Sequence, residues 1–315
     1  MKVVPKTRLA ALALCFGLPL GLLAQSPEEP VDDQPAYSKK GADTCLNCHD
    51  DEITLAVFRG KHAVPTDPRT PFGHGQLQCE ACHGPGGKHT ARVRRGEGRP
   101  PMIRFGSEAP TPVNVQNEMC ASCHAADLGF GWHGSAHDDN TVACADCHDS
   151  HTASDPVFAT ATQPEVCFTC HQLQRSDSYK PYAHPIREGK MDCTGCHDPH
   201  GSTTEHQLVR QTLNDTCYQC HAEKRGPFLW EHAPASDDCS ICHAPHGSTQ
   251  PGMLTQRGPL LCQSCHSQTG HPSVAQTADG LASGDPSRFL LGQSCVNCHS
   301  QVHGSNHPSG YKLMR

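Results

Sequence analysis

The stretch Cys193-Thr194-Gly195-Cys196-His197-Asp198-Pro199-His200-Gly201 contains the pattern that decides the fold. Its first part, Cys-x-x-Cys-His, occurs ten times in the 315 residues and uses every cysteine except Cys15. A pattern that recurs this often is the organising repeat of the chain. The cysteine pairs are Cys45 and Cys48, Cys79 and Cys82, Cys120 and Cys123, Cys144 and Cys147, Cys167 and Cys170, Cys193 and Cys196, Cys217 and Cys220, Cys239 and Cys242, Cys262 and Cys265, and Cys295 and Cys298.

The spacing inside each motif is the attachment signature of c-type haem. Two thiols one helical turn apart bond to the two vinyl groups of the porphyrin, and the imidazole of the next residue binds the iron. The sequence therefore predicts ten covalently attached haem c groups. Their predicted proximal ligands are His49, His83, His124, His148, His171, His197, His221, His243, His266 and His299.

Three other uses of paired cysteines fit less well. A zinc ribbon needs two Cys-x-x-Cys pairs for each metal ion, and nothing in that site requires a histidine after every pair. Disulfide scaffolds do not distribute their bridges at a strict three-residue spacing with a constant histidine neighbour. A thioredoxin-like redox pair needs a βαβ context, and no periodic strand pattern surrounds any of the ten motifs.

The composition predicts the architecture. Aromatic residues make up only 5% of the chain, whereas 28 Gly and 26 Pro interrupt helices and strands. Residues 25–315 number 291, which leaves about 29 residues for each haem, so the haems must pack against one another. We expect a multihaem cytochrome c made mostly of loops and short α-helices wrapped around a chain of ten haems, with little or no β-structure. Acidic residues outnumber basic ones by 32 to 25, which argues against a nucleic-acid partner.

The remaining histidines supply candidates for the opposite face of each iron. Ten of the 24 histidines stand in motifs, which leaves 14, and every segment after a motif contains at least one. The candidate lies 11 or 13 residues after four of the odd-numbered motifs and three to six residues after the even-numbered ones, so the chain consists of five double-motif units. The predicted distal ligands are His62, His89, His137, His151, His184, His200, His232, His246, His271 and His303; the surplus histidines are His74, His133, His206 and His307.

The short spacing also predicts which haems these ligands serve. His151, His200 and His246 each follow a motif histidine by three residues, a stretch of at most about 10 Å. Such a stretch does not carry the second imidazole around the porphyrin edge to the opposite face, so each should bind a neighbouring haem. The ninth segment departs from the spacing pattern, because its candidate, His271, follows the motif by five residues.

Segments outside the motifs predict export and mostly irregular structure. Lys2, Lys6 and Arg8 precede an apolar run, so residues 1–24 are expected to form a cleaved signal peptide and residues 25–40 a disordered leader. No later apolar run reaches 18 residues, so no transmembrane helix is expected in the mature chain. Six basic residues in segment 88–104 favour a solvated loop, with propionate pairing or partner docking as alternatives. Helix starts are expected at Asp43-Thr44, Asn117-Glu118, Pro164-Glu165 and Asn214-Asp215.

With these features the chain resembles the decahaem cytochromes of the MtrA/DmsE family. The resemblance rests on the signal peptide, the ten motifs and phrases such as Cys-His-Asp-Pro-His-Gly at residues 196–201. It implies two pentahaem halves, residues 41–176 and 177–315, with bis-histidine haems. It also implies a place within an outer-membrane β-barrel porin. Electrons would then pass from a periplasmic or inner-membrane-anchored donor cytochrome to an extracellular acceptor protein or reductase.

Two other functions remain open beside this conduit. A soluble periplasmic electron shuttle would use the same haems without the membrane partner. A multihaem reductase of the nitrite or hydroxylamine type would need at least one open iron with acid or base groups nearby. Because histidines cover all ten segments, the sequence favours electron transfer over an enzyme, and no catalytic residue is predicted.

The motif count yields a prediction of stoichiometry. The exported protein should carry ten covalently bound haems, because each motif offers two thiols and a proximal imidazole. Intact mass measured after signal cleavage should show all ten. A mass that corresponds to eight or fewer, with free thiols or bound zinc, would contradict the haem interpretation.

Overall fold

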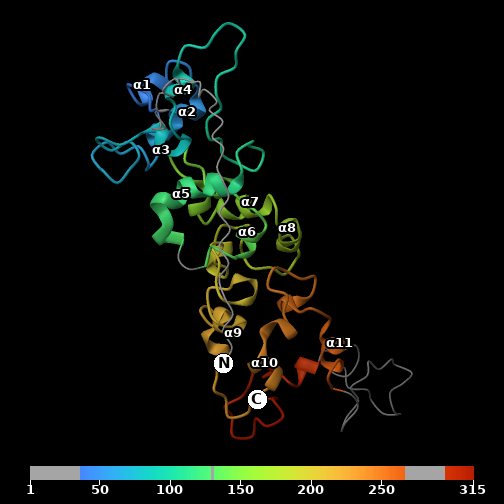
Figure 1. Ribbon diagram of the computed structural model, residues 1–315. Helices are drawn as coiled ribbons and strands as arrows, with labels where there is room; N and C mark the ends of the chain where they lie inside the picture. Colours follow the sequence, from blue (N-terminus) through green and yellow to red (C-terminus); the bar gives the residue numbers. More distant parts are fainter. Residues whose placement is uncertain (1–35, 129–130, 267–294) are drawn as a thin grey trace, which may run out of the picture. The chain divides into compact units, whose positions relative to one another are not determined.

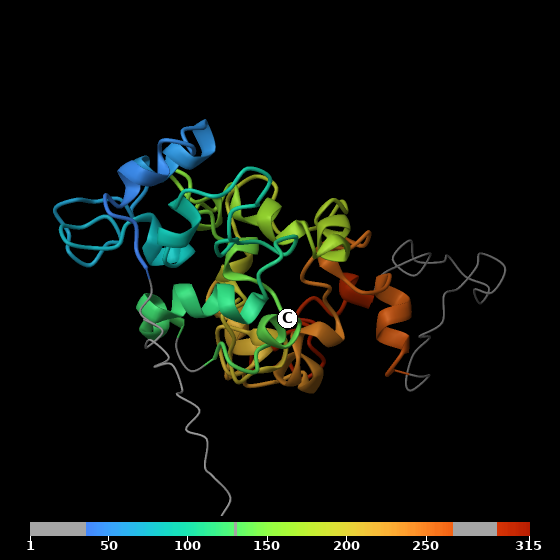
Figure 2. The ribbon, with the colours of Figure 1, turned by 45° about the horizontal axis from the view of Figure 1, so that its top comes forward.

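A computed structural model describes residues 36–128, 131–266 and 295–315. The predicted signal peptide, residues 25–35 of the predicted leader and His271 lie outside these ranges. Figures 1 and 2 show short helices joined by long irregular segments. The α-helices are α1 (Ala42–Cys45), α2 (Glu52–Ala56), α3 (Cys79–His83), α4 (Gly87–Thr90), α5 (Val113–Leu128), α6 (Ala136–Asp139), α7 (Gln163–Phe168), α8 (Gln172–Ser178), α9 (Leu213–Cys217), α10 (Ala233–Asp237) and α11 (Gly258–Gln263).

Single turns of 3-10 helix complete the described secondary structure. They are η1 (Val57–Arg59), η2 (Cys144–Asp146), η3 (Pro156–Phe158), η4 (Cys193–Gly195), η5 (Glu205–Gln207), η6 (Ala222–Lys224), η7 (Cys239–Ile241), η8 (Pro251–Met253) and η10 (Cys295–Asn297). Strand-like pairing in the described ranges is limited to isolated bridges, such as those from His197 to Leu208 and from His243 to Leu254. The predicted fold class, loops and short helices with little β-structure, is therefore confirmed.

The motifs themselves form the turns, and from motif three onward their helix type alternates along the chain, whereas motif two forms the α-helix α3. In motif after motif the main-chain N–H of the histidine donates to the carbonyl of the first cysteine, as from His197 to Cys193 at 3.0 Å. Odd-numbered motifs start within or at the end of α1, α5, α7, α9 and α11, whereas motifs four, six, eight and ten start 3-10 turns. This alternation parallels the double-motif pattern of the sequence.

Carboxamide side chains, two of them buried, tie the two motifs of a unit together. The Asn214 side-chain oxygen accepts the N–H of Cys239 at 2.8 Å, and its NH2 group donates to the carbonyls of Ala235 and Ser236. Gln163 makes the equivalent bond to Cys193 at 3.0 Å. A third carboxamide, on Asn117, accepts from Cys144 at 2.9 Å. Each therefore fixes the first cysteine of an even-numbered motif against the helix of the preceding motif.

These hydrogen bonds give Asn117 and Asn214 a role other than the predicted one of starting a helix. Asn117 lies inside α5, and at α9 the N-terminal cap is Thr212, whose side chain accepts the N–H of Asp215. Asn117 and Asn214 thus hold the neighbouring motif and do not start their helices. Pro164, by contrast, lies in the first turn of α7, as predicted. A carboxamide three or four residues before the first cysteine of motifs three, five and seven is the sequence signal for this role.

The polypeptide supplies little apolar core. In the described ranges the buried apolar residues are Ala42, Ala56, Val57, Trp132, Ala143, Phe168 and Leu208. A cavity of about 5520 Å³ runs between the segments and is lined by residues of all ten motifs. Ordinary small-molecule sites measure about 300–1,000 Å³, so this space suits a row of large cofactors. No helix of the described residues is long and apolar enough to cross a membrane.

Substitution of Asn214, whose side chain bonds the two motifs of a unit together, should destabilise the fold. Asn214→Ala removes the acceptor for Cys239 and leaves backbone groups around it without partners, which should lower the free energy of unfolding by about 1–3 kcal/mol. Denaturant titration followed by haem absorbance measures the change. Asn140→Ala is the control, because that exposed side chain bonds only to a carbonyl one turn away. Equal effects of the two substitutions would contradict the proposed role.

Candidate haem-binding sites

The structure brings histidine rings together in nine facing pairs within its described ranges. Each pair joins one motif histidine to one predicted distal ligand, with ring centres 6.0 to 6.4 Å apart. The pairs are His49 with His89, His83 with His151, His124 with His62, His148 with His200, His171 with His137, His197 with His246, His221 with His184, His243 with His303, and His266 with His232.

In each pair, the ring that is not part of a motif comes from a segment other than the one that directly follows the facing motif. His151, His200 and His246 face His83, His148 and His197, two motifs back along the chain, in line with the argument from their three-residue spacing. His62, His137, His184 and His232 face the motif histidine two motifs ahead. The ninth motif histidine, His266, therefore lies opposite His232. Sequence spacing alone did not indicate these partners.

The four surplus histidines stand apart from these pairs. His133 is strongly exposed and lies 3.6 Å from the Asp138 carboxylate, and His206 lies 3.5 Å from that of Glu205. The Nδ1 of His307 accepts the N–H of Ser309. His74 is exposed. None of the four rings belongs to one of the nine pairs.

Main-chain carbonyls orient many of the paired rings. Nδ1 of His197 donates to the carbonyl of His206, and Nδ1 of His243 donates to that of Gly252, each at 2.8 Å. Because a carbonyl only accepts, Nδ1 carries the proton and Nε2 keeps its lone pair for a metal. Similar bonds to carbonyls are made by His83, His89, His137, His184, His232 and, in the tenth motif, His299.

Burial keeps several of these imidazoles neutral, which is the form that binds metal. Desolvation is the largest cause, and the facing ring of the pair disfavours a positive charge further. The pKa is lowered in this way at His62, His83, His171, His200, His246 and His303.

Tight loops place two of the distal rings. Pro199 and Gly201 flank His200, and Gly201 adopts a φ of +106°, a conformation that favours glycine. A Cβ on Gly201 would also collide with the carbonyl of Gly131. Gly247, which follows His246, has a positive φ as well, and a Cβ there would meet the carbonyl of Asp177. The Pro-His-Gly phrase therefore turns each histidine toward its partner while another segment packs against the turn.

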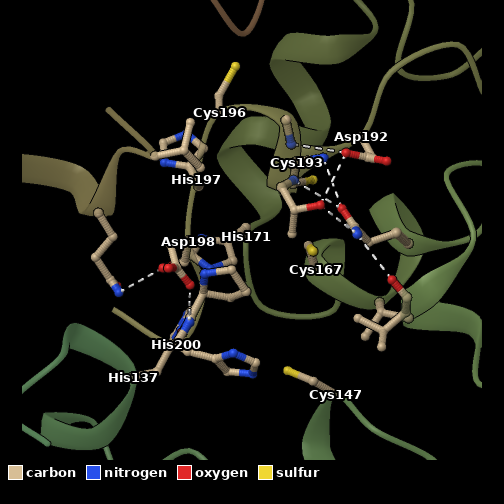
Figure 3. Close-up of a pocket in the computed structure, with 18 of the residues that line it drawn as sticks. His137, Cys147, Cys167, His171, Asp192, Cys193, Cys196, His197, Asp198 and His200 are labelled. Carbon is tan, nitrogen blue, oxygen red and sulfur yellow. Dashed lines mark hydrogen bonds between the residues drawn. The ribbon is translucent and has the colours of Figure 1, made fainter. Parts of the chain in front are cut away.

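The cysteines show the order of the attachment sites. The first cysteines of the two motifs in a unit lie close enough for one thiol to shift the pKa of the other, and Figure 3 shows this proximity for Cys167 and Cys193. The other four such contacts join Cys45 to Cys79, Cys120 to Cys144, Cys217 to Cys239 and Cys262 to Cys295. Between units, Cys82, Cys147, Cys196 and Cys242 lie near the next motif. The ten Cys-x-x-Cys-His motifs therefore lie next to one another in chain order.

The ring pairs fit a bis-histidine haem. With a metal–nitrogen bond of about 2.0 Å, as for zinc, and a ring centre about 1 Å behind that nitrogen, two imidazoles on opposite sides of one metal ion lie about 6 Å apart. The nine observed separations match this value. Figure 3 shows one such arrangement, with His137 and His171 near Cys167.

The structure also shows the contacts of two segments outside the motifs, the basic segment 88–104 and the end of the predicted leader. In the basic segment 88–104, Arg99 donates to the carbonyls of His89 and Ala91 and the other arginines are exposed. At the end of the predicted leader, Ser38 donates to the Glu80 carboxylate through both its N–H and its hydroxyl, at 2.9 and 2.7 Å. The first segment therefore lies beside a paired histidine, and residues close to the first motif are bonded to the second.

Short turns around repeated Cys-x-x-Cys-His motifs and facing imidazoles define a multihaem cytochrome of the c type. The family described as Doubled CXXCH motif matches residues 184–226 and 232–271, and the Cytochrome c-type protein NrfB-like family matches residues 79–164. The chain is 50% identical over 283 residues to the multiheme cytochrome MtrA of Shewanella baltica, a match that covers 89% of this chain and 83% of that protein. The chain belongs to the MtrA family of multihaem cytochromes.

A more distant relative is the cytochrome c-type protein NrfB of Haemophilus influenzae. It is 25% identical over 150 residues, which cover 35% of this chain and 66% of that protein. Together the matches establish that the chain binds haem c and is an electron-transfer cytochrome.

Proposed function

We propose that the chain holds ten haems in single file, one at each motif, and passes electrons along them across the outer membrane. The observation that carries the proposal is the set of nine facing imidazole pairs, linked through neighbouring motif cysteines in chain order. A haem held by two imidazoles supplies reversible one-electron transfer and has no open coordination position. The chain's own residues attach, orient and enclose these groups.

The proposed axial ligands are the nine ring pairs described above, together with His299 of the tenth motif. His271 remains a proposed axial ligand and lies outside the described residues. The motif cysteines are the proposed attachment points. The paired ring centres are separated by a distance that suits one metal ion between them, and main-chain carbonyls hold the orientation of many of the rings.

This arrangement favours electron transfer over substrate reduction. A reductase of the nitrite or hydroxylamine type needs an iron with one free position and a proton donor nearby. At nine motifs a second imidazole stands where a substrate would have to bind. We therefore assign no catalytic residue to the chain.

The membrane-crossing role follows from length and from the family. If each haem advances the path by about 10 Å, the diameter of one helix, nine steps cover on the order of 90 Å, or less if the path zigzags. A bilayer with its headgroups is about 40–45 Å thick. The irregular backbone would expose unpaired polar groups to lipid, so an enclosing outer-membrane β-barrel porin is the proposed partner. The similarity to MtrA supports this reading.

The conduit needs partners at both ends. We propose export by the cleaved signal peptide, a periplasmic or inner-membrane-anchored cytochrome as donor, and an extracellular acceptor protein or reductase. The two pentahaem halves, residues 41–176 and 177–315, would meet between motifs five and six. There Cys167 interacts with Cys193 across the boundary and Gln163 bonds to the Cys193 N–H, so the path continues from one half to the next. A soluble shuttle remains the alternative.

The ligand assignment can be tested by opening one site. The wild-type ferrous protein should bind essentially no carbon monoxide, because both axial positions are filled. His200→Ala should create one binding haem, the one attached at Cys144 and Cys147, because His200 faces His148. Absorbance titration with carbon monoxide measures the binding sites. His206→Ala is the matched control and should bind none, since His206 is exposed and unpaired with another ring. Carbon monoxide binding by the wild type would instead favour the reductase.

The conduit itself is tested by reconstitution. Liposomes that enclose a redox dye should exchange electrons with an external reductant only when they contain both this protein and its candidate barrel, because the haem chain is then the sole path through the bilayer. Dye absorbance follows the exchange, with liposomes that contain the barrel alone as control. If the protein associates with no barrel and equilibrates only with soluble partners, the shuttle replaces the conduit.

A further inference from the structure

Two motif histidines differ from the others in what holds Nδ1. His148 is hydrogen-bonded to the Asp155 carboxylate and His124 to that of Asp127, each at 2.9 Å. In the described ranges these are the motif histidines with a carboxylate at hydrogen-bond distance from Nδ1. Where Nδ1 of another motif histidine has a described hydrogen bond, the acceptor is a main-chain carbonyl, at His83, His197, His243 and His299.

The two carboxylates differ in exposure. The Asp155 side chain is 13% exposed, whereas that of Asp127 is 76% exposed. Water screens a charge at an exposed position far more strongly than at a buried one. Asp155 should therefore act on its imidazole much more strongly than Asp127 does.

The local fold positions one carboxylate oxygen of Asp155 for the contact with His148. Asp155 is the N-cap of η3, where its Oδ1 accepts the N–H of Val157 at 3.2 Å. Oδ2 is then directed at Nδ1 of His148. The centre of the Phe158 ring, from the same turn, lies 5.4 Å from that of the His148 ring. Asp155 is thus a positioning residue, held in place by the turn that it caps.

We propose that Asp155 lowers the reduction potential of the haem attached at Cys144 and Cys147 and makes the fourth centre the most reducing one in the chain. The inference rests on the proposed bis-histidine ligation by His148 and His200. A carboxylate that shares the Nδ1 proton makes the imidazole a stronger electron donor to iron, which stabilises the ferric over the ferrous state. One electron enters on reduction, no bond forms or breaks, and the proton stays on Nδ1.

The consequence is an uphill step for the electron at the fourth of the ten proposed centres. An electron that enters the fourth centre from the third or the fifth goes to the site that is hardest to reduce. His124, held by the exposed Asp127, should make the adjacent third centre the next most affected. The unit formed by motifs three and four would then limit the flow of electrons through the chain.

The test is Asp155→Asn in the full haem-loaded protein. Asn keeps an oxygen for the η3 cap and removes the negative charge. The most reducing component of a spectroelectrochemical titration should move up by about 59 mV or more, which corresponds to a tenfold change in a one-electron reduction equilibrium. Asp155→Glu, which keeps the carboxylate, should restore most of the wild-type potential. Asp127→Asn should raise the reduction potential of the third centre by a smaller amount.

The matched control is Glu118→Gln. It removes one exposed negative charge from α5, two residues before the first cysteine of motif three, and its side chain has no described hydrogen bond or ion pair. An unchanged lowest potential in Asp155→Asn would overturn the inference, as would an equal rise in Asp155→Glu or in Glu118→Gln. Absence of carbon monoxide binding in these variants shows that ligation is intact. Carbon monoxide binding by the wild type would instead overturn the proposed function on which the inference rests.

Discussion

The structure depends on one interaction, two imidazoles that face each other about 6 Å apart from different parts of the chain. Few apolar residues are buried in the part of the chain that the structure describes, so burial of side chains cannot hold its long irregular segments together. The ring pairs join residues as distant as His243 and His303, or His83 and His151. A metal between them would make each contact a cross-link, which resembles the way structural metals stabilise small domains that lack a core.

Local features of this design were predictable from the sequence, and long-range ones were not. A motif with two cysteines and a histidine is a single turn wherever it stands, so the turns, the fold class and the set of candidate ligands follow from spacing. The partner of each ligand does not. The spacing of His200 excludes its own motif histidine, but it does not distinguish His148 from other neighbours. Asn214 shows the same limit, because its pattern fits a helix start and its actual bond is to Cys239, 25 residues away.

Besides the ring pairs, hydrogen bonds from side-chain carboxamides to the main chain hold neighbouring motifs together. The carboxamides of Gln163 and Asn214 fix two motifs of a unit side by side, so neighbouring attachment sites keep a constant relation. Within a unit the thiols of the first cysteines interact, and between units the second cysteine of an even-numbered motif lies near the next motif. Electron transfer needs short and constant separations between centres, and here a few carboxamide side chains bonded to backbone N–H groups hold neighbouring motifs in place.

A further bond connects successive sites. Nδ1 of His137 donates to the carbonyl of Pro199, directly before His200, and Nδ1 of His184 donates to that of Pro245, directly before His246. His232 repeats the pattern with Val302, directly before His303. One ring of the fifth, seventh and ninth sites is thus anchored on the peptide that carries a ring of the adjacent even-numbered site. A shift of one imidazole would therefore strain its neighbour. Because both sites resist movement together, a change of charge at either centre should cause little rearrangement of the chain, which is the condition that fast electron transfer requires.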